Sequence, residues 1–190
     1  MVARTHNAFA FASLVTAAVY FPPVGINVMT LVTSFIAVSI GALIPDMDSS
    51  GNTLWKLLPS GAILSKNLRK IFYKHRTLTH SLLGVGLFYV GLAFLLPRIL
   101  NPGFVDPLII HASIMVGYAS HLLADSLTEE GIPLLFPLRI NFGIPPIRRM
   151  RIKTGRWFEN LVIYPGIWIY LVIFVQNNRE VLESILKNLG

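Results

Sequence analysis

The histidines and aspartates of this chain gather at the ends of its apolar segments. Ionisable groups at membrane depth are costly unless they are paired, hydrated or bound to a cation. Imidazole nitrogens and carboxylate oxygens are together suited to zinc, manganese or iron. Seven of the nine such residues fall on one side of an alternating membrane topology, and we take them as candidate metal ligands: His6, Asp46, Asp48, His75, His80, His121 and Asp125.

Spacing within two motifs predicts how these side chains meet. His121 and Asp125 are four residues apart, so they share one face of a helix and can reach the same centre. His75 and His80 are five apart, which separates them on a helix surface. We therefore expect His75 in the approach to a helix and His80 in its first turns.

Asp46 and Asp48 follow Pro45, which disfavours a helical residue before it and ends the preceding helix. The short segment after the helix can turn both carboxylates toward one cation or bridge two. Three carboxylates and four imidazoles exceed what one tetrahedral ion needs. We therefore expect two divalent ions, with zinc as the first choice and manganese or iron as alternatives.

Two residues are expected to take part in catalysis. Arg76, next to His75, carries a guanidinium that can bind a phosphate group through two parallel hydrogen bonds. Asp48 is the other residue; two ions that share a bridging aspartate can hold the attacking and leaving oxygens of a phosphoester.

Composition identifies the kind of scaffold that must position these groups. The chain has 190 residues, of which 54% are hydrophobic and 13% charged, and its mean hydropathy is +0.63. These values are typical of an integral membrane protein. The absence of cysteine excludes disulfides and thiolate ligands.

Five apolar segments predict an all-α, polytopic membrane helix bundle of about five spanning or partly spanning helices. They cover residues 7–21, 27–45, 77–96, 108–127 and 160–176. A helix rises about 1.5 Å per residue and the hydrocarbon core is about 30 Å thick, so the second to fourth segments can span and the first and last are short. Residues 55–73 mix apolar and basic residues and predict an interfacial helix. We expect one domain over residues 1–190.

Lysine and arginine predict the orientation of the bundle. Thirteen of the sixteen fall on the side that carries the candidate ligands, and only Arg98, Arg179 and Lys187 fall on the other. The positive-inside rule places the richer side, and with it the N-terminus and the site, in the cytoplasm. This topology and the attraction of anionic lipids account for the net charge of +7 without nucleic acid.

Two residues at the opposite end of the bundle serve as internal controls. Asp106 precedes the fourth segment, and His111 lies ten residues, or about 15 Å of helix, before His121. Neither is expected to bind metal. Glu129 and Glu130, just past Asp125, are treated as ordinary surface carboxylates with the general base as their alternative role.

Several motifs carry a resemblance to a known family. They are Thr5-His6, Pro45-Asp46-Met47-Asp48, His75-Arg76-Thr77-Leu78-Thr79-His80-Ser81 and Ser120-His121-Leu122-Leu123-Ala124-Asp125-Ser126-Leu127-Thr128, followed by Gly131 and Phe136-Pro137. Residues 1–137 thereby resemble the YdjM-type family of membrane-bound, metal-dependent hydrolases, while the fifth segment lies beyond the motifs. The resemblance implies an all-helical hydrolase of the inner membrane.

The sequence thus leads to one expected function and a rival. We expect hydrolysis of a phosphoester or related bond in an anionic lipid, with an anionic phospholipid or a polyprenyl phosphate as candidate substrate. In the rival interpretation, a transporter or channel uses the same cluster to carry divalent cations or protons. A third interpretation is a protein in which the metal only stabilises structure. The oligomeric state is left open.

Overall fold

The structure is a computed structural model that describes residues 1–48, 78–138, 140–187 and 189. Its elements are α1 (Ala3–Tyr20), α2 (Val28–Leu43), the short 3-10 helix η1 (Pro45–Asp48), α5 (Leu82–Ile99), α6 (Pro107–Ser126), η2 (Arg148–Met150), the π-helical turn η3 (Glu159–Ile163), α7 (Tyr164–Asn177) and α8 (Arg179–Lys187). No strand occurs among these residues, although two isolated bridges join loop segments. The predicted all-helical membrane fold is confirmed.

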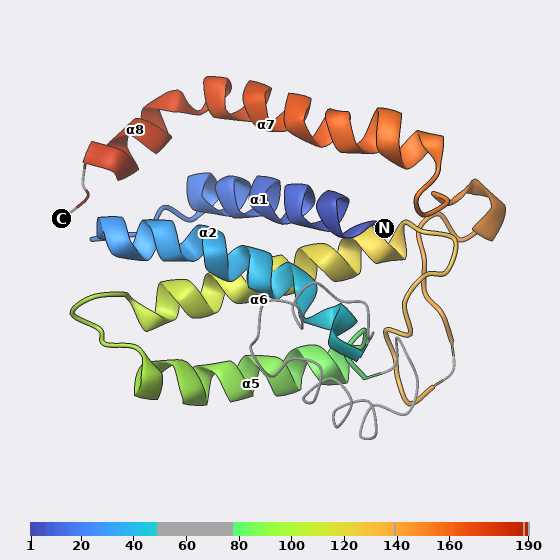
Figure 1. The fold of residues 1–190 in the computed structure, drawn as a ribbon, viewed down its shortest axis with the longest axis horizontal. Coiled ribbons are helices and arrows are strands. Elements are labelled where there is room, and N and C mark those ends of the chain that lie inside the picture. The colour runs from blue at the N-terminus through green and yellow to red at the C-terminus, as the bar shows by residue number, and fades with distance from the viewer. Residues whose placement is uncertain (49–77, 139, 188, 190) are drawn as a thin grey trace.

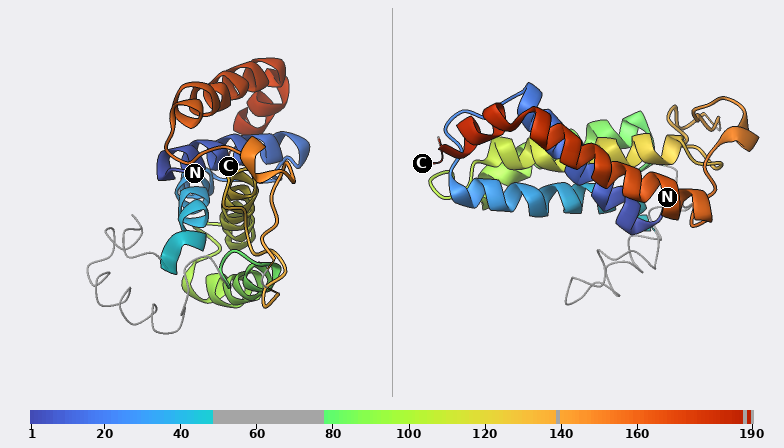
Figure 2. Two further views of the ribbon diagram at one scale, coloured as in Figure 1. Left: turned by 90° about the vertical axis from the view of Figure 1, so that its right-hand side faces the viewer. Right: turned by 90° about the horizontal axis from the view of Figure 1, so that it is seen from above.

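The long helices form layers, which follow one another as α7, α1, the pair α2 and α6, and α5 (Figures 1 and 2). The N-terminus, η1 and the start of α5 lie at one end of the bundle, whereas α8 lies at the other end. Helices α2 and α6 make the most extensive contact of the bundle, with α1 packed against both. The ends of four elements are thereby brought together around the N-terminus.

Glycines let α2 and α6 approach each other closely. A Cβ atom on Gly41 would lie 2.1 Å from the carbonyl oxygen of Ile114, and one on Gly117 would lie 2.1 Å from that of Val38. Neither position has room for a side chain. Small residues at such contacts are a common means of packing helices in membranes, where no hydrophobic force drives helices together.

Side chains and prolines set the ends of the helices. The side chains of Asn27, Ser81 and Asp106 accept hydrogen bonds from backbone N–H groups in the first turns of α2, α5 and α6. These caps satisfy donors that have no partner within the helix. Helix α2 ends at Leu43, just before Pro45, and the chain continues as η1.

Among the described residues, three helices are long and apolar enough to cross a membrane: Leu82–Ile99, Pro107–Ser126 and the continuous stretch Glu159–Asn177. Helix α2 is apolar but has only 16 residues. The second segment was expected to span and the fifth to be short. In the structure the helix of the second segment is below spanning length, whereas the fifth is long enough to span. The π-helical turn η3 adds the extra length at the start of the fifth.

Two candidate ligands have different settings from those expected. His6 lies within the first turns of α1, which begins at Ala3 rather than after the histidine. His80 lies just before α5 and not in its first turns, because Ser81 is the residue that caps the helix. The expected interfacial helix at residues 55–73 lies outside the described residues.

Candidate metal centre

Four of the predicted ligands meet at one end of the bundle. Asp46 from η1, His80 from the turn before α5, and His121 and Asp125 from α6 each offer a ligand atom within 4.8 Å of the others. The His80 Nε2 atom lies 3.6 Å from Asp46 Oδ1 and 3.7 Å from Asp125 Oδ2. The His121 Nε2 atom lies 3.8 and 3.7 Å from the same two oxygens.

These separations suit donors arranged around one cation. Ligand atoms about 2.1 Å from a tetrahedral ion lie about 3.4 Å from one another. The His121 Nε2 and Asp46 Oδ1 atoms are buried and have no hydrogen-bond partner among the described residues. Buried polar groups normally have a partner, so the nitrogen and oxygen donor set fits a divalent metal ion.

The Nδ1 atoms of His80 and His121, which point away from the cluster, have partners that fix the orientation of the rings. The His121 Nδ1 atom lies 2.6 Å from the carbonyl oxygen of Ala42, and the His80 Nδ1 atom lies 3.2 Å from Thr79 Oγ1. Such partners orient metal-binding imidazoles and set their tautomer. Burial lowers the pKa of His80 below its usual value, which favours the neutral ring that binds metals.

The second oxygen of Asp125 faces a different set of groups. The His6 Nε2 atom lies 3.2 Å from Asp125 Oδ1, and the amino group of Met1 lies 2.5 Å from the same oxygen. The His6 ring stacks on His121 with ring centroids 3.8 Å apart and planes inclined by 6°. Asp125 is fully buried. Its Oδ2 atom faces His80 and His121, whereas its Oδ1 atom faces His6 and Met1.

The remaining candidates are separated from this group or not described. His75 and Arg76 lie outside the described residues, and so does the side chain of Asp48, whose backbone ends η1. His111 contacts the carbonyl oxygen of Tyr89 at 3.0 Å, and Asp106 caps α6. Both controls therefore have structural partners at the other end of the bundle. Glu129 forms an ion pair with Lys153 at 4.0 Å.

The hydroxyl groups of the motif residues have two kinds of partner. Thr79 contacts His80, whereas four other hydroxyl groups donate to backbone carbonyl oxygens. These belong to Ser81, Ser120, Ser126 and Thr128. The latter hydroxyls therefore stabilise the local backbone.

Sequence reasoning missed one buried carboxylate, Glu159. It is fully buried in η3 and accepts hydrogen bonds from the backbone N–H groups of Val2 at 2.8 Å and Gly155 at 2.7 Å. Glu159 thereby ties the start of the last spanning stretch to the residue before α1. An acidic residue at the start of the apolar segment 160–176 was the available signal.

The fold and the four-residue cluster define an all-helical membrane protein with a possible metal-binding centre at one end of its bundle. The chain belongs to the YdjM inner membrane protein family, whose family model matches residues 1–185. The match therefore reaches beyond the motifs of residues 1–137 and through the fifth segment.

Two relatives illustrate the family. The uncharacterized protein YvsG of Bacillus subtilis is 34% identical over 163 residues, which cover 86% of this chain and 88% of YvsG. The inner membrane protein YdjM of Escherichia coli is 36% identical over 103 residues, which cover 54% of this chain and 48% of that protein. No solved structure matches the chain significantly.

Proposed function

We propose that this protein is a membrane-embedded, metal-dependent hydrolase that cleaves a phosphoester or related bond in an anionic lipid. The observation that carries the proposal is the convergence of Asp46, His80, His121 and Asp125 within 4.8 Å at the end of an apolar bundle. A divalent cation held there would supply Lewis-acid activation of a water molecule and charge neutralisation at the phosphoryl oxygens.

Some residues of the cluster would bind the cation, and others hold the binding side chains in place. His80 and His121 offer their Nε2 atoms, while Thr79 and Ala42 hold the opposite ring nitrogens. The two oxygens of Asp125 face different neighbours, which supports a bridging role in which a second ion on the side of His6 replaces the Met1 amino group at Oδ1. Asp48 and His75 remain predicted ligands of this pair, with zinc as the first choice.

Basic residues near this end support an anionic substrate. Among the described residues they are Arg4, Arg148, Arg149, Arg151, Lys153 and Arg156, most of them exposed. The segment that carries the last five lies at the same end of the bundle as the N-terminus (Figure 1). A cationic rim beside an apolar bundle favours a headgroup that is charged and a tail that is not. Arg76 is assigned to the phosphate in this proposal.

Transport is the weaker alternative, because a pathway requires polar groups along its length. Within the described core, Ser34 donates its hydroxyl to Thr30 O at 2.7 Å, and Ser113 donates to Ile109 O at 2.8 Å. These hydroxyls are used by their own helices. The ionisable cluster thus gathers at one end, as a reaction centre at the membrane surface requires.

The proposal is tested by metal content and turnover of the purified protein. Metal is measured by mass spectrometry, and phosphoester cleavage is measured with an anionic phospholipid and a polyprenyl phosphate in detergent micelles. We expect bound divalent metal in the native protein, and loss of both metal and turnover in His121→Ala and Asp125→Asn, because each substitution removes a donor atom.

His111→Ala is the matched control, since it removes a histidine from the same helix at the opposite end. It should retain metal and turnover. Unchanged metal content and turnover after both ligand substitutions would overturn the proposal. Divalent-cation flux in reconstituted vesicles without lipid cleavage would favour the transporter instead.

A further inference from the structure

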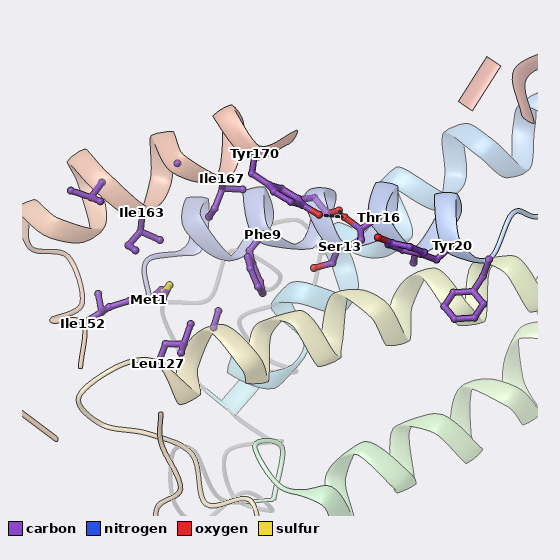
Figure 3. A pocket seen from close by; sticks show the side chains of 16 residues that line it. Met1, Phe9, Ser13, Thr16, Tyr20, Leu127, Ile152, Ile163, Ile167 and Tyr170 are labelled. Carbon is purple, nitrogen blue, oxygen red and sulfur yellow. Dashed lines mark hydrogen bonds between the residues drawn. The ribbon is translucent and has the colours of Figure 1, made fainter. Parts of the chain in front are cut away.

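A long apolar cavity lies between α1 and α7 (Figure 3), and Met1 at one end of it contacts Asp125 of the candidate metal centre. Its volume is about 660 Å³, within the range of about 300–1,000 Å³ that is usual for ligand pockets. One wall is α1, with Phe9, Ser13 and Thr16, and the other is α7, with Ile167 and Tyr170. We call this cavity the α1–α7 groove.

The groove reaches the metal centre through three residues at one end. Met1, Ala124 and Leu127 line it there. The amino group of Met1 contacts Asp125 Oδ1, and Ala124 directly precedes Asp125 in α6. A molecule whose polar group lies at the candidate metal centre can therefore place its apolar part in the groove by passing Met1, which lies between the groove and Asp125.

The shape of the groove favours a linear occupant. From Phe9 to Tyr20 it follows twelve residues of α1, or about 17 Å of helix. Thr16 Oγ1 lies 2.9 Å from Tyr170 OH, so the two walls are tied to each other partway along (Figure 3). Tyr20 and Phe21 lie at the far end.

Charge near the opening distinguishes the two ends of such an occupant. Ile152 lines the groove beside Met1, and it lies between Arg151 and Lys153 in the chain. Of these, Lys153 is exposed and pairs with Glu129 only at 4.0 Å, whereas the Arg151 guanidinium donates to the carbonyl oxygens of Pro145 and Pro146. Lys153 therefore suits an anionic headgroup, and the groove walls are almost wholly apolar. The occupant is thus an amphiphile with its charge at the metal end.

We propose that the α1–α7 groove holds one hydrocarbon chain of the anionic lipid whose headgroup lies at the candidate metal centre. The proposal rests on the proposed function for the position of the headgroup. It adds that the protein selects substrates with a linear tail, which extends from Asp125 toward Phe21. The length of the α1–α7 groove then determines which tail lengths are preferred.

The test uses hexadecyl phosphate with a photoreactive diazirine at the end of its tail, bound to the full chain in detergent. We expect crosslinks at the far end of the groove, between Thr16 and Phe21 of the N-terminal region and around Tyr170. Gly166 lines the groove, and a Cβ atom added to it would meet nothing within 4 Å. Gly166→Leu should therefore fill the groove and reduce these crosslinks at least fivefold.

Gly86→Leu is the matched control, because this exposed glycine of α5 also has open space around its position and lies away from the groove. It should leave the crosslinks unchanged. Ser13→Phe, from the opposite wall, repeats the test if Gly166→Leu fails to fold, and thermal unfolding in detergent identifies a folding failure.

The outcomes separate this proposal from the proposed function. Crosslinks spread over the exposed faces of α5 and α7, with equal yield in Gly166→Leu and native protein, would overturn the groove and show ordinary bilayer contact. Turnover that is equal for butyl and hexadecyl phosphoesters would also overturn it while leaving the hydrolase intact. Groove crosslinks that depend on Gly166, without any phosphoester cleavage, would support the groove and reject the hydrolase.

Discussion

Asp125 is a fully buried carboxylate in contact with groups from two parts of the chain. Its Oδ2 atom lies 3.7 Å from the Nε2 atoms of both His80 and His121, and its Oδ1 atom lies 3.2 Å from His6 Nε2. A buried carboxylate is costly unless its charge is compensated. Replacement of Asp125 should therefore affect both the His80–His121 part of the candidate centre and the part around His6.

The threonine beside His80 provides a residue-scale prediction. Thr79→Val keeps the side-chain shape and removes the hydroxyl that lies 3.2 Å from His80 Nδ1. Loss of such an orienting partner typically weakens metal affinity by about 10–100-fold. We expect a loss in this range, measured by competition with a chelator, while the protein remains folded.

Thr33→Val is the corresponding control. Thr33 is partly exposed and donates its hydroxyl to Met29 O within its own helix, at 2.6 Å. Its replacement should leave metal affinity unchanged. Equal affinities in Thr79→Val, Thr33→Val and the native protein would show that Thr79 does not orient His80.

Residue types and spacing predicted much of the candidate centre, but not its backbone partners. The positions of Asp46, His80, His121 and Asp125 at segment ends led to a shared site, and the structure brings these four together. The carbonyl oxygen of Ala42 could not be predicted, because every residue carries one and only packing selects which reaches His121.

At the scale of elements, the close approach of α2 and α6 determines the geometry of the centre. A Cβ atom on Gly117 would meet the Ala42 backbone nitrogen at 2.9 Å as well as Val38 O at 2.1 Å. The Ala42 carbonyl in turn holds His121. The packing of two helices and the orientation of one ligand are thus coupled through the same short stretch of α2.

Gly117→Ala tests this coupling. The added methyl group must push α2 away from α6, because backbone atoms of α2 cannot move aside as a side chain would. We expect a loss of roughly 1–3 kcal/mol in unfolding free energy, as is typical of overpacking. Metal affinity should fall as well, because Ala42 moves away from His121.

Gly86→Ala is the control for this substitution, since a Cβ atom there has open space. It should change neither the unfolding free energy in detergent nor the metal affinity appreciably. If Gly117→Ala lowers stability and leaves metal affinity intact, helix packing and ligand orientation are independent.

The length and apolar character of the segments predicted which helices form, but predicted less well the residues at which they begin and end. The five apolar segments correspond to α1, α2, α5, α6 and α7, and Pro45 ends α2 as expected. The sequence predicts a short fifth segment, because the apolar run begins after Glu159. A buried, hydrogen-bonded carboxylate continues the helix there, which hydropathy alone does not reveal.

For the whole molecule, orientation in the membrane follows from the distribution of charge and remains a prediction. The chain contains no cysteine, so a single introduced cysteine reports the side on which it lies. Lys153 is exposed near the candidate centre, and Asn101 is exposed in the link between α5 and α6 at the other end. The two positions should lie on opposite sides of the membrane.

In intact spheroplasts, a membrane-impermeant maleimide should label Asn101→Cys and should label Lys153→Cys only after permeabilisation. This result follows from the excess of lysine and arginine on the side of Lys153. The reverse pattern would place the candidate centre outside the cytoplasm, and labelling of both positions in intact cells would contradict a spanning arrangement.

The hydrogen bond from Val2 to Glu159 also orders events during synthesis. The two residues are 157 positions apart, so the start of α1 leaves the ribosome long before its anchor exists. Contacts between distant parts of a chain form late, because the intervening loop must close first. The helix that carries His6 is made first and can pack on α2 and α6 before the chain is finished, whereas its hydrogen bond to Glu159 can form only after the final spanning stretch has been synthesised. The four residues of the cluster are therefore all made before the start of α1 receives this last contact.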